Sequence, residues 1–198
     1  MHDLRDGLAR FRKDAFPARQ ELFALLATDH RPGTLFVGCS DARVVPELIT
    51  QSEPGDLFVI RTAGNLVPAY TPAADGVAAS VEYAVAVLGV RDIVVCGHSA
   101  CGAMTALAEE HDLSGAPLTA AWLRHADAAR ARTASGTADA DRVDALVRAN
   151  VAAQLRNLTT HPSVIRALAE GELALHGWVF DIRTGTVDTV DAGAATAA

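Results

Sequence analysis

Three side chains that bind soft divalent metals stand at the ends of two apolar runs of the sequence. Cys39 lies at the end of TLFVGCS (34–40), His98 ends DIVVCGH (92–98), and Cys101 follows three residues later. Two thiolates and one imidazole form a known catalytic zinc set, in which the fourth position is left for water. Soft ligands of this kind favour zinc over magnesium or calcium. The sequence therefore predicts a Zn2+ ion held by these three side chains.

A carboxylate and a guanidinium follow the first of these cysteines. Asp41 stands two residues after Cys39, close enough to accept a hydrogen bond from a metal-bound hydroxide and to orient it. Arg43 stands two residues further on and can hold Asp41 through two parallel hydrogen bonds. We expect Asp41 to move onto the metal when Arg43 is removed. The alternative interpretation is a surface ion pair, which contributes little to stability.

The elements that must position these groups follow from the apolar pattern. The continuous runs 34–40, 57–63 and 92–98 predict strands buried on both faces of a parallel sheet. The segment 76–90 has the length of a helix and ends at Gly89, which gives a strand–helix–strand unit. In an open α/β sheet the loops after the carboxyl ends of the strands converge on one crevice. Cys39 and His98 are therefore expected to meet although they are far apart in the chain.

The remaining segments complete a single α/β domain over residues 1–198. We predict helices within 3–29, after Cys101, over 117–131 and over 141–158, with a loop over 131–140. The segment 172–190 predicts a last strand, a turn at Thr184-Gly185 and a short return strand. Residues 1–30 are interpreted as an N-terminal helical arm and 192–198 as a flexible tail.

Composition excludes several classes of function. The net charge of -7 and the pI of about 5.4 disfavour binding to nucleic acid or to anionic membranes. No apolar run reaches the roughly 20 residues of a membrane span, and the charged N-terminus predicts a cytoplasmic protein. Three cysteines without a secretion signal argue against a disulfide framework. Cys96 lies inside a predicted strand, and we assign it a structural role away from the crevice.

With these residues in place, the chain resembles the β-class carbonic anhydrases, especially the bacterial type encoded beside cyanate-degrading enzymes. The resemblance covers residues 11–182 and includes the stretches EPGDLFVIRTAGNLVP (53–68), SVEYAV (80–85), GHSACGAM (97–104) and HGWVFDI (176–182). It implies zinc-dependent, reversible hydration of carbon dioxide to bicarbonate and a proton by metal-bound hydroxide. It also implies a mainly parallel central β-sheet flanked by helices. The subunits of that family form homodimers or higher oligomers, with the N-terminal helices on a partner subunit and the active site at the interface.

The resemblance also assigns residues to substrate binding. It implies an apolar carbon dioxide pocket that includes Phe58, Ala63 and Tyr83, with Gly102 beside the metal. Many relatives carry a glutamine where this chain has His30, and there it donates a hydrogen bond to substrate across the interface. We hypothesise that His30 binds substrate or relays protons, and the alternative is an exposed turn residue.

A second departure from the family concerns its allosteric members, which bind bicarbonate through a tryptophan and a tyrosine. Phe36 and Phe180 stand at those positions and cannot supply the polar contacts. We therefore expect a metal site that is always open, with water as the fourth ligand at neutral pH.

Several other residues receive structural interpretations. We interpret His161, before Pro162, as a cap or surface residue, and His176 as a core or interface residue. Arg61 is given a structural role in preference to an ion pair or an anion contact. Two alternative functions stay open, namely a carbon disulfide or carbonyl sulfide hydrolase of the same fold and a non-catalytic zinc-binding protein.

Overall fold

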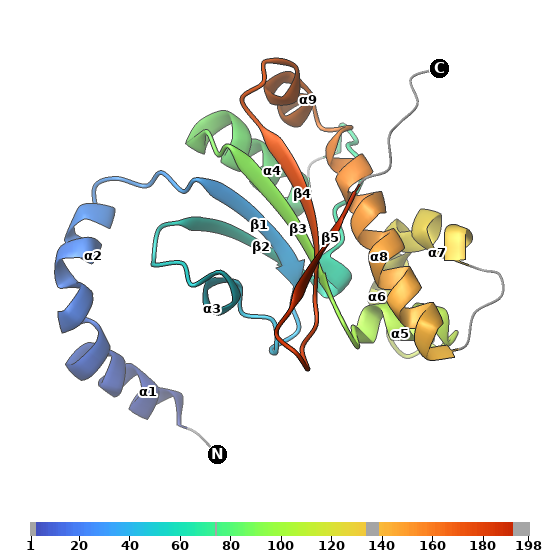
Figure 1. The fold of residues 1–198 in the computed structure, drawn as a ribbon, viewed down its shortest axis with the longest axis horizontal. Coiled ribbons are helices and arrows are strands. Elements are labelled where there is room, and N and C mark those ends of the chain that lie inside the picture. Colours follow the sequence, from blue (N-terminus) through green and yellow to red (C-terminus); the bar gives the residue numbers. More distant parts are fainter. Residues whose placement is uncertain (1–2, 74, 134–138, 192–198) are drawn as a thin grey trace.

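The computed structural model describes residues 3–73, 75–133 and 139–191, and a five-stranded sheet forms its centre (Figure 1). The strands are β1 (Thr34–Cys39), β2 (Leu57–Thr62), β3 (Asp92–His98), β4 (Ala174–Phe180) and β5 (Val187–Val190). Their order is β2-β1-β3-β4-β5, and only the β4–β5 pair is antiparallel. The predicted α/β fold with a mainly parallel sheet is confirmed.

Helices flank this sheet. The α-helices are α1 (Leu4–Arg10), α2 (Gln20–Leu26), α3 (Pro46–Thr50), α4 (Gly76–Glu82), α5 (Gly102–Ala108), α6 (Pro117–Leu123), α7 (Asp127–Thr133), α8 (Asp139–Leu158) and α9 (Pro162–Ala169). Shorter π- and 3-10 segments are η1 (Phe11–Ala15), η2 (Pro17–Arg19), η3 (Ala63–Asn65), η4 (Tyr83–Leu88) and η5 (Arg124–Ala126). Among the described residues, no helix is long and apolar enough to cross a membrane.

The main core lies on one face of the sheet. Leu35, Val37, Ile93 and Val95 point from β1 and β3 into this core, which the helices α4, α5, α8 and α9 complete. The alternate residues of the same strands form a smaller cluster on the opposite face. β1 and β3 are buried on both faces as predicted, whereas β2 is mostly half-buried because it lies at the edge of the sheet.

The N-terminal arm extends away from this body. Figure 1 shows α1 and α2 running outward from the sheet, at the far side from α8. Several large apolar side chains of the arm are exposed, with Leu4 at 86% and Leu25 at 68%. A helix normally buries its apolar stripe against another element, so the arm leaves a surface without a partner inside this chain.

Some boundaries differ from the predictions. The helix predicted over 76–90 is α4 followed by η4, and it ends at Gly89, whose φ of 69° is left-handed. The loop predicted over 131–140 is helical at both ends, while 134–138, like the predicted tail 192–198, lies outside the described residues. The helices α3 and α9 were not predicted.

Two glycines allow α8 to lie close to the sheet. A Cβ on Gly97 of β3 would meet Val151 Cγ2 at 2.8 Å, and one on Gly177 of β4 would meet Leu155 Cδ1 at 2.9 Å and collide with the Val190 carbonyl of β5. Backbone and packed core atoms have little room to move. These two positions therefore fix the separation between α8 and the strands β3 and β4.

We predict that Gly177→Ala lowers the stability of the fold. Overpacking against backbone costs about 2 kcal/mol, or about 5 °C in melting temperature for a chain of this length. The matched control is Gly115→Ala, where an added Cβ meets nothing within 4 Å. Thermal unfolding followed by circular dichroism measures both, and an equal melting temperature for the two variants would contradict the prediction.

Candidate metal centre

Two neighbouring parallel strands bring the predicted metal ligands together. Gly38 of β1 pairs with Cys96 of β3, so that Cys39 and His98 emerge at the same edge of the sheet. Cys101 is the residue that caps the start of α5. The three ligand atoms lie within 4.8 Å of one another, and all three residues are buried. The sheet thus creates a closed cluster of two sulfurs and one imidazole.

The imidazole presents a free nitrogen to the two sulfurs. His98 Nδ1 lies 2.9 Å from the carbonyl oxygen of Ser99 and must donate to it, because a carbonyl can only accept. The neutral ring then carries a lone pair on Nε2, which is buried and has no hydrogen-bond partner. A hydrogen bond to one nitrogen commonly fixes the tautomer of a metal-binding histidine in this way. The donor set and the unpartnered nitrogen fit a divalent soft metal such as zinc.

A left-handed residue shapes the turn between His98 and Cys101. Ala100 has φ of 51°, a conformation that costs an alanine about 1 kcal/mol or more. The turn allows His98 and Cys101 to face the same point while α5 begins directly afterwards. The carbonyl oxygen of Ala100 accepts a hydrogen bond from Arg43 Nη2 at 3.0 Å.

The two thiols share their protons unequally when no cation lies between them. The hydrogen bond from Cys101 lowers the pKa of Cys39 to about 4, helped by the backbone N–H groups of Asp41 and Gly64. Cys101, which keeps its proton beside this thiolate, has its pKa raised. The shifts favour a thiolate at Cys39 in the metal-free cluster, and a divalent cation would also stabilise a thiolate at Cys101.

Asp41 and Arg43 form a bidentate pair at the border of the cluster. Arg43 Nε donates to Asp41 Oδ1 at 2.9 Å and Nη2 donates to Oδ2 at 2.7 Å, while the Arg43 backbone N–H also reaches Oδ1 at 2.9 Å. The Arg43 side chain holds the pKa of Asp41 well below its usual range. Asp41 Oδ2 lies 3.9 Å from His98 Nε2, so an ionised carboxylate faces the metal ligands.

The predicted substrate residues fall into two groups. Ala63 follows β2 in η3, and Gly102 is the first residue of α5, so both adjoin the ligand loops. His30, Phe58 and Tyr83 form a separate cluster, with ring centroids 6.5 Å and 5.9 Å apart across Phe58.

The register of the sheet separates this cluster from the metal ligands. Phe58 pairs with Leu35, whereas Cys39 pairs with Thr62, four residues further along β2. At ~3.3 Å per residue the separation is about 13 Å. Within one chain, Phe58 therefore lies near the start of its strand, away from the metal ligands. The pocket implied by the resemblance, with its active site at a subunit interface, stays a prediction.

Comparison with known proteins identifies the family. The family model described as carbonic anhydrase matches residues 34–187. A carbonic anhydrase of Pseudomonas aeruginosa is 61% identical over 193 residues, which cover 96% of this chain and 88% of that protein. The β-carbonic anhydrase CcaA superposes with a TM-score of 0.89 and 41% identity, covering 95% of this chain and 97% of the other. A tetrameric β-carbonic anhydrase of the filamentous ascomycete Sordaria macrospora gives a TM-score of 0.84 and 32% identity, with 98% of each chain covered.

This chain belongs to the β-class carbonic anhydrase family. The predicted enzymatic function, which is the lyase reaction that reversibly hydrates carbon dioxide, is confirmed by this membership. The resemblance noted from the motifs is confirmed as well, since the matched range includes both ligand loops.

The other residues singled out in the carbonic anhydrase sequence have structural surroundings. Cys96 is fully buried on the opposite face of the sheet, where burial raises its pKa to about 12. His161 is the N-cap residue of α9, so the cap interpretation is confirmed by position. Its side chain is buried, with Nε2 3.0 Å from the Pro68 carbonyl oxygen, so the surface interpretation is wrong. His176 is half-exposed and pairs with Asp92 at 2.7 Å. Phe36 and Phe180 lie in the small cluster with Cys96.

Sequence reasoning missed a row of buried amides on α8 that holds the loop after β2. Asn150 Nδ2 donates to the Gly64 carbonyl at 2.9 Å, Gln154 Oε1 accepts from Val67 N at 3.0 Å, and Asn157 Nδ2 donates to the Val67 carbonyl at 2.8 Å. The signal was available, because these amides recur at helical spacing on the buried side of α8. They supply the hydrogen bonds that irregular buried backbone requires.

We predict that loading the metal-free carbonic anhydrase with zinc at about pH 6 releases about one proton per ion. The lowered pKa of Cys39 leaves one thiolate in the metal-free pair, so only Cys101 must lose a proton. Calorimetry in buffers of different ionisation enthalpy counts the protons. Release of about two protons would contradict the prediction.

Proposed function

We propose that this chain hydrates carbon dioxide at one zinc ion bound by Cys39, His98 and Cys101. The observation that carries the proposal is the cluster of three buried ligand atoms within 4.8 Å, of which His98 Nε2 has no other partner. Closed structural zinc sites use four protein ligands, whereas catalytic sites use three and leave one position free. The nearest further candidate, Asp41, is held by Arg43.

When bound, zinc supplies the acidity that gives a hydroxide nucleophile near neutral pH, since it lowers the pKa of coordinated water to about 7 in favourable sites. Two thiolate ligands donate more charge than imidazoles, so outer residues must assist. We assign to Asp41 the task of accepting the hydrogen bond that orients the nucleophile. Its ionised state, maintained by Arg43, suits an acceptor because an ionised carboxylate has no proton to donate.

Arg43 has a second task in this proposal, which is to restrain Asp41. Its guanidinium uses two parallel hydrogen bonds on the carboxylate and a third on the Ala100 carbonyl. The guanidinium of Arg43 therefore links the loop that follows Cys39 to the loop between His98 and Cys101. With Asp41 oriented toward Arg43, the fourth metal position stays open to water and carbon dioxide at neutral pH.

We predict that Cys101→Ser abolishes both zinc binding and catalysis. The native chain should hold about one zinc ion per chain, and the variant should lose most of it together with more than about 100-fold of the hydration rate. Metal analysis and stopped-flow hydration of carbon dioxide measure the two quantities. The matched control is Cys96→Ala, which removes a thiol from the opposite face of the sheet and should keep both.

The same stopped-flow series can include carbon disulfide and carbonyl sulfide. Hydrolysis of either is the alternative function of this fold, and the ligand set alone does not separate the substrates. The Pseudomonas aeruginosa relative, named a carbonic anhydrase, favours carbon dioxide. Full zinc content without turnover of any of the three substrates would favour a non-catalytic zinc protein.

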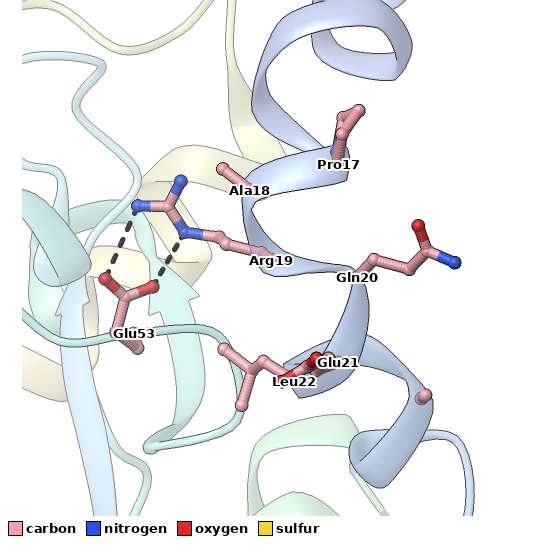
Figure 2. Close-up of a pocket in the computed structure, with 8 residues that line it drawn as sticks. Pro17, Ala18, Arg19, Gln20, Glu21, Leu22 and Glu53 are labelled. Carbon is pink, nitrogen blue, oxygen red and sulfur yellow. Dashed lines mark hydrogen bonds and ion pairs between the residues drawn. The ribbon is translucent and has the colours of Figure 1, made fainter.

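We further propose that the chain works as a homodimer or a higher oligomer. Figure 2 shows the side chain of Arg19, in the arm, directed at Glu53 of the body. Arg19 Nε donates to Glu53 Oε2 at 2.8 Å, and both residues line an open pocket of about 940 Å³. The exposed apolar residues of the arm need a cover, and a second copy of the chain supplies one by symmetry. The tetrameric relative from Sordaria macrospora supports such an assembly.

Association also accounts for the separation of the substrate residues. We propose that His30, Phe58 and Tyr83 of a second copy complete the pocket beside Ala63 and Gly102 of the first. Phe58 and Tyr83 would then enclose an apolar substrate, and His30 would donate a hydrogen bond to it. In this arrangement each chain contributes to two active sites.

We predict that two inactive variants restore activity when they share a dimer. Cys101→Ser removes the metal but keeps Tyr83, and Tyr83→Ala keeps the metal. Random pairing makes half of the dimers mixed, each with one complete site, so about a quarter of the native rate should return. Co-refolded or co-expressed mixtures test this. If Tyr83 acts on the metal of its own chain, the mixture gains no activity over the sum of its parts.

We propose a cytoplasmic location for the enzyme. The structure contains three free cysteines, two of which must stay reduced to bind the metal. Thiols persist in the reducing cytosol and oxidise readily outside it. The net charge of -7 gives no support for nucleic acid or anionic membranes as partners.

A further inference from the structure

Arg61 on β2 directs its side chain to the main chain of a single loop. Nε donates to the Cys39 carbonyl at 3.1 Å, and Nη2 donates to the carbonyls of Asp41 and Val44, each at 2.7 Å. These three carbonyls belong to the segment that carries a metal ligand and the Asp41–Arg43 pair. Within the described part of the chain, no carboxylate contacts Arg61, so an ion pair does not account for its position.

The geometry of the guanidinium restricts the relative positions of the three carbonyl groups. Its donors lie in one plane at fixed angles, so three carbonyls bound to it are fixed relative to one another as well. The end of the loop is also anchored, because Val44 is fully buried, whereas Ala42 and Arg43 are exposed. Before Val44, the main chain of the loop is held by the Ser40 N–H bond to the Thr62 carbonyl, and the Asp41 carbonyl accepts from Arg61 and from Val44 N at 3.0 Å.

Arg61 and Arg43 together connect three neighbouring segments at the edge of the sheet. Arg61 connects β2 to the loop after β1, and Arg43 connects that loop to Ala100 in the loop after β3. Asp41 receives hydrogen bonds from both arginines, on its main chain from Arg61 and on its carboxylate from Arg43. A shift of the loop would therefore move the carboxylate relative to His98 Nε2.

We propose that Arg61 is a positioning residue for the hydration reaction, which holds the main chain of Asp41 so that the carboxylate stays beside the metal ligands. This inference rests on the proposed role of Asp41 in orienting the nucleophile. It requires the planar group of arginine, because its donors sit at fixed angles on two nitrogen atoms, whereas the three donors of a lysine rotate about a single nitrogen and cannot reproduce that arrangement. Arg61 itself contacts neither metal nor substrate in this proposal.

The first test compares Arg61→Ala, Arg61→Lys and the control Arg31→Ala, which removes an exposed arginine paired with Asp29. Both Arg61 variants should lose about 10- to 100-fold in kcat, with little change in KM and with zinc still bound at one ion per chain. Arg31→Ala should match the native enzyme. Millimolar guanidinium should restore part of the rate to Arg61→Ala, and methylammonium should not.

The second test places the Arg61 change in an Asp41→Asn background. If Arg61 acts through Asp41, the double variant should be about as slow as Asp41→Asn alone, because coupled residues are not additive. The visible spectrum of the cobalt-substituted chain gives a readout that does not depend on turnover. Arg61→Ala should change that spectrum in the same direction as Arg43→Ala, since the first loosens the main chain of Asp41 and the second frees its carboxylate.

Several outcomes would overturn the inference. Native activity in Arg61→Lys would show that charge suffices, and fully multiplicative losses in the double variant would show that Asp41 is not the link. If Arg61→Ala fails to fold, the rate and the cobalt spectrum of Arg61→Lys test the role of Arg61 instead. Failure of the Cys101→Ser test would overturn the proposed function itself, whereas a native rate in Arg61→Ala with that test passed would remove only the role of Arg61.

Discussion

Two buried thiols can both ionise beside each other only if a cation joins them. The opposite shifts in the pKa of Cys39 and of Cys101 express this constraint, since one sulfur gains a charge at the expense of the other. The unpartnered Nε2 of His98 points to the same need, because a buried polar atom is normally satisfied. The rest of the fold serves to hold these three groups at one point, where zinc would neutralise both sulfurs.

The cancelled charge of such a zinc site would account for the ionised carboxylate beside the ligands. Two thiolates cancel the charge of a zinc ion, so less of it is available to acidify water than in a site with three histidines. An ionised acceptor close by becomes valuable, and Asp41 is kept ionised by Arg43. The same carboxylate could occupy the open metal position if it were free. In our proposals, its double attachment, to Arg43 by the side chain and to Arg61 by the main chain, would prevent that movement.

The sequence predicted the strands and the ligand set because both depend on local patterns. Buried runs such as TLFVGC and DIVVCGH, each ending in a metal-binding side chain, place those side chains at one edge of a parallel sheet. The short helices α3 and α9 were missed, although each begins with a proline at its first position, which is a typical start signal. The left-handed Ala100 could not be predicted, since alanine rarely adopts that conformation.

The position of Phe58 could not be inferred from the family resemblance alone, because it depends on the register of the sheet. The resemblance placed the active site at an interface and the residue at position 30 across it, but it did not say which chain supplies Phe58. In strand β2, Thr62, which pairs with Cys39, stands four residues after Phe58, so the two ends of one strand lie at different places. Arg61 lies near the metal end and Phe58 at the other. An edge strand that is only half-buried on its own can serve one site at each end if a second copy of the chain covers it. In the proposed oligomer, the exposed edge at β2, the uncovered arm and the divided pocket would share one physical cause, which is that the catalytic unit is larger than one chain.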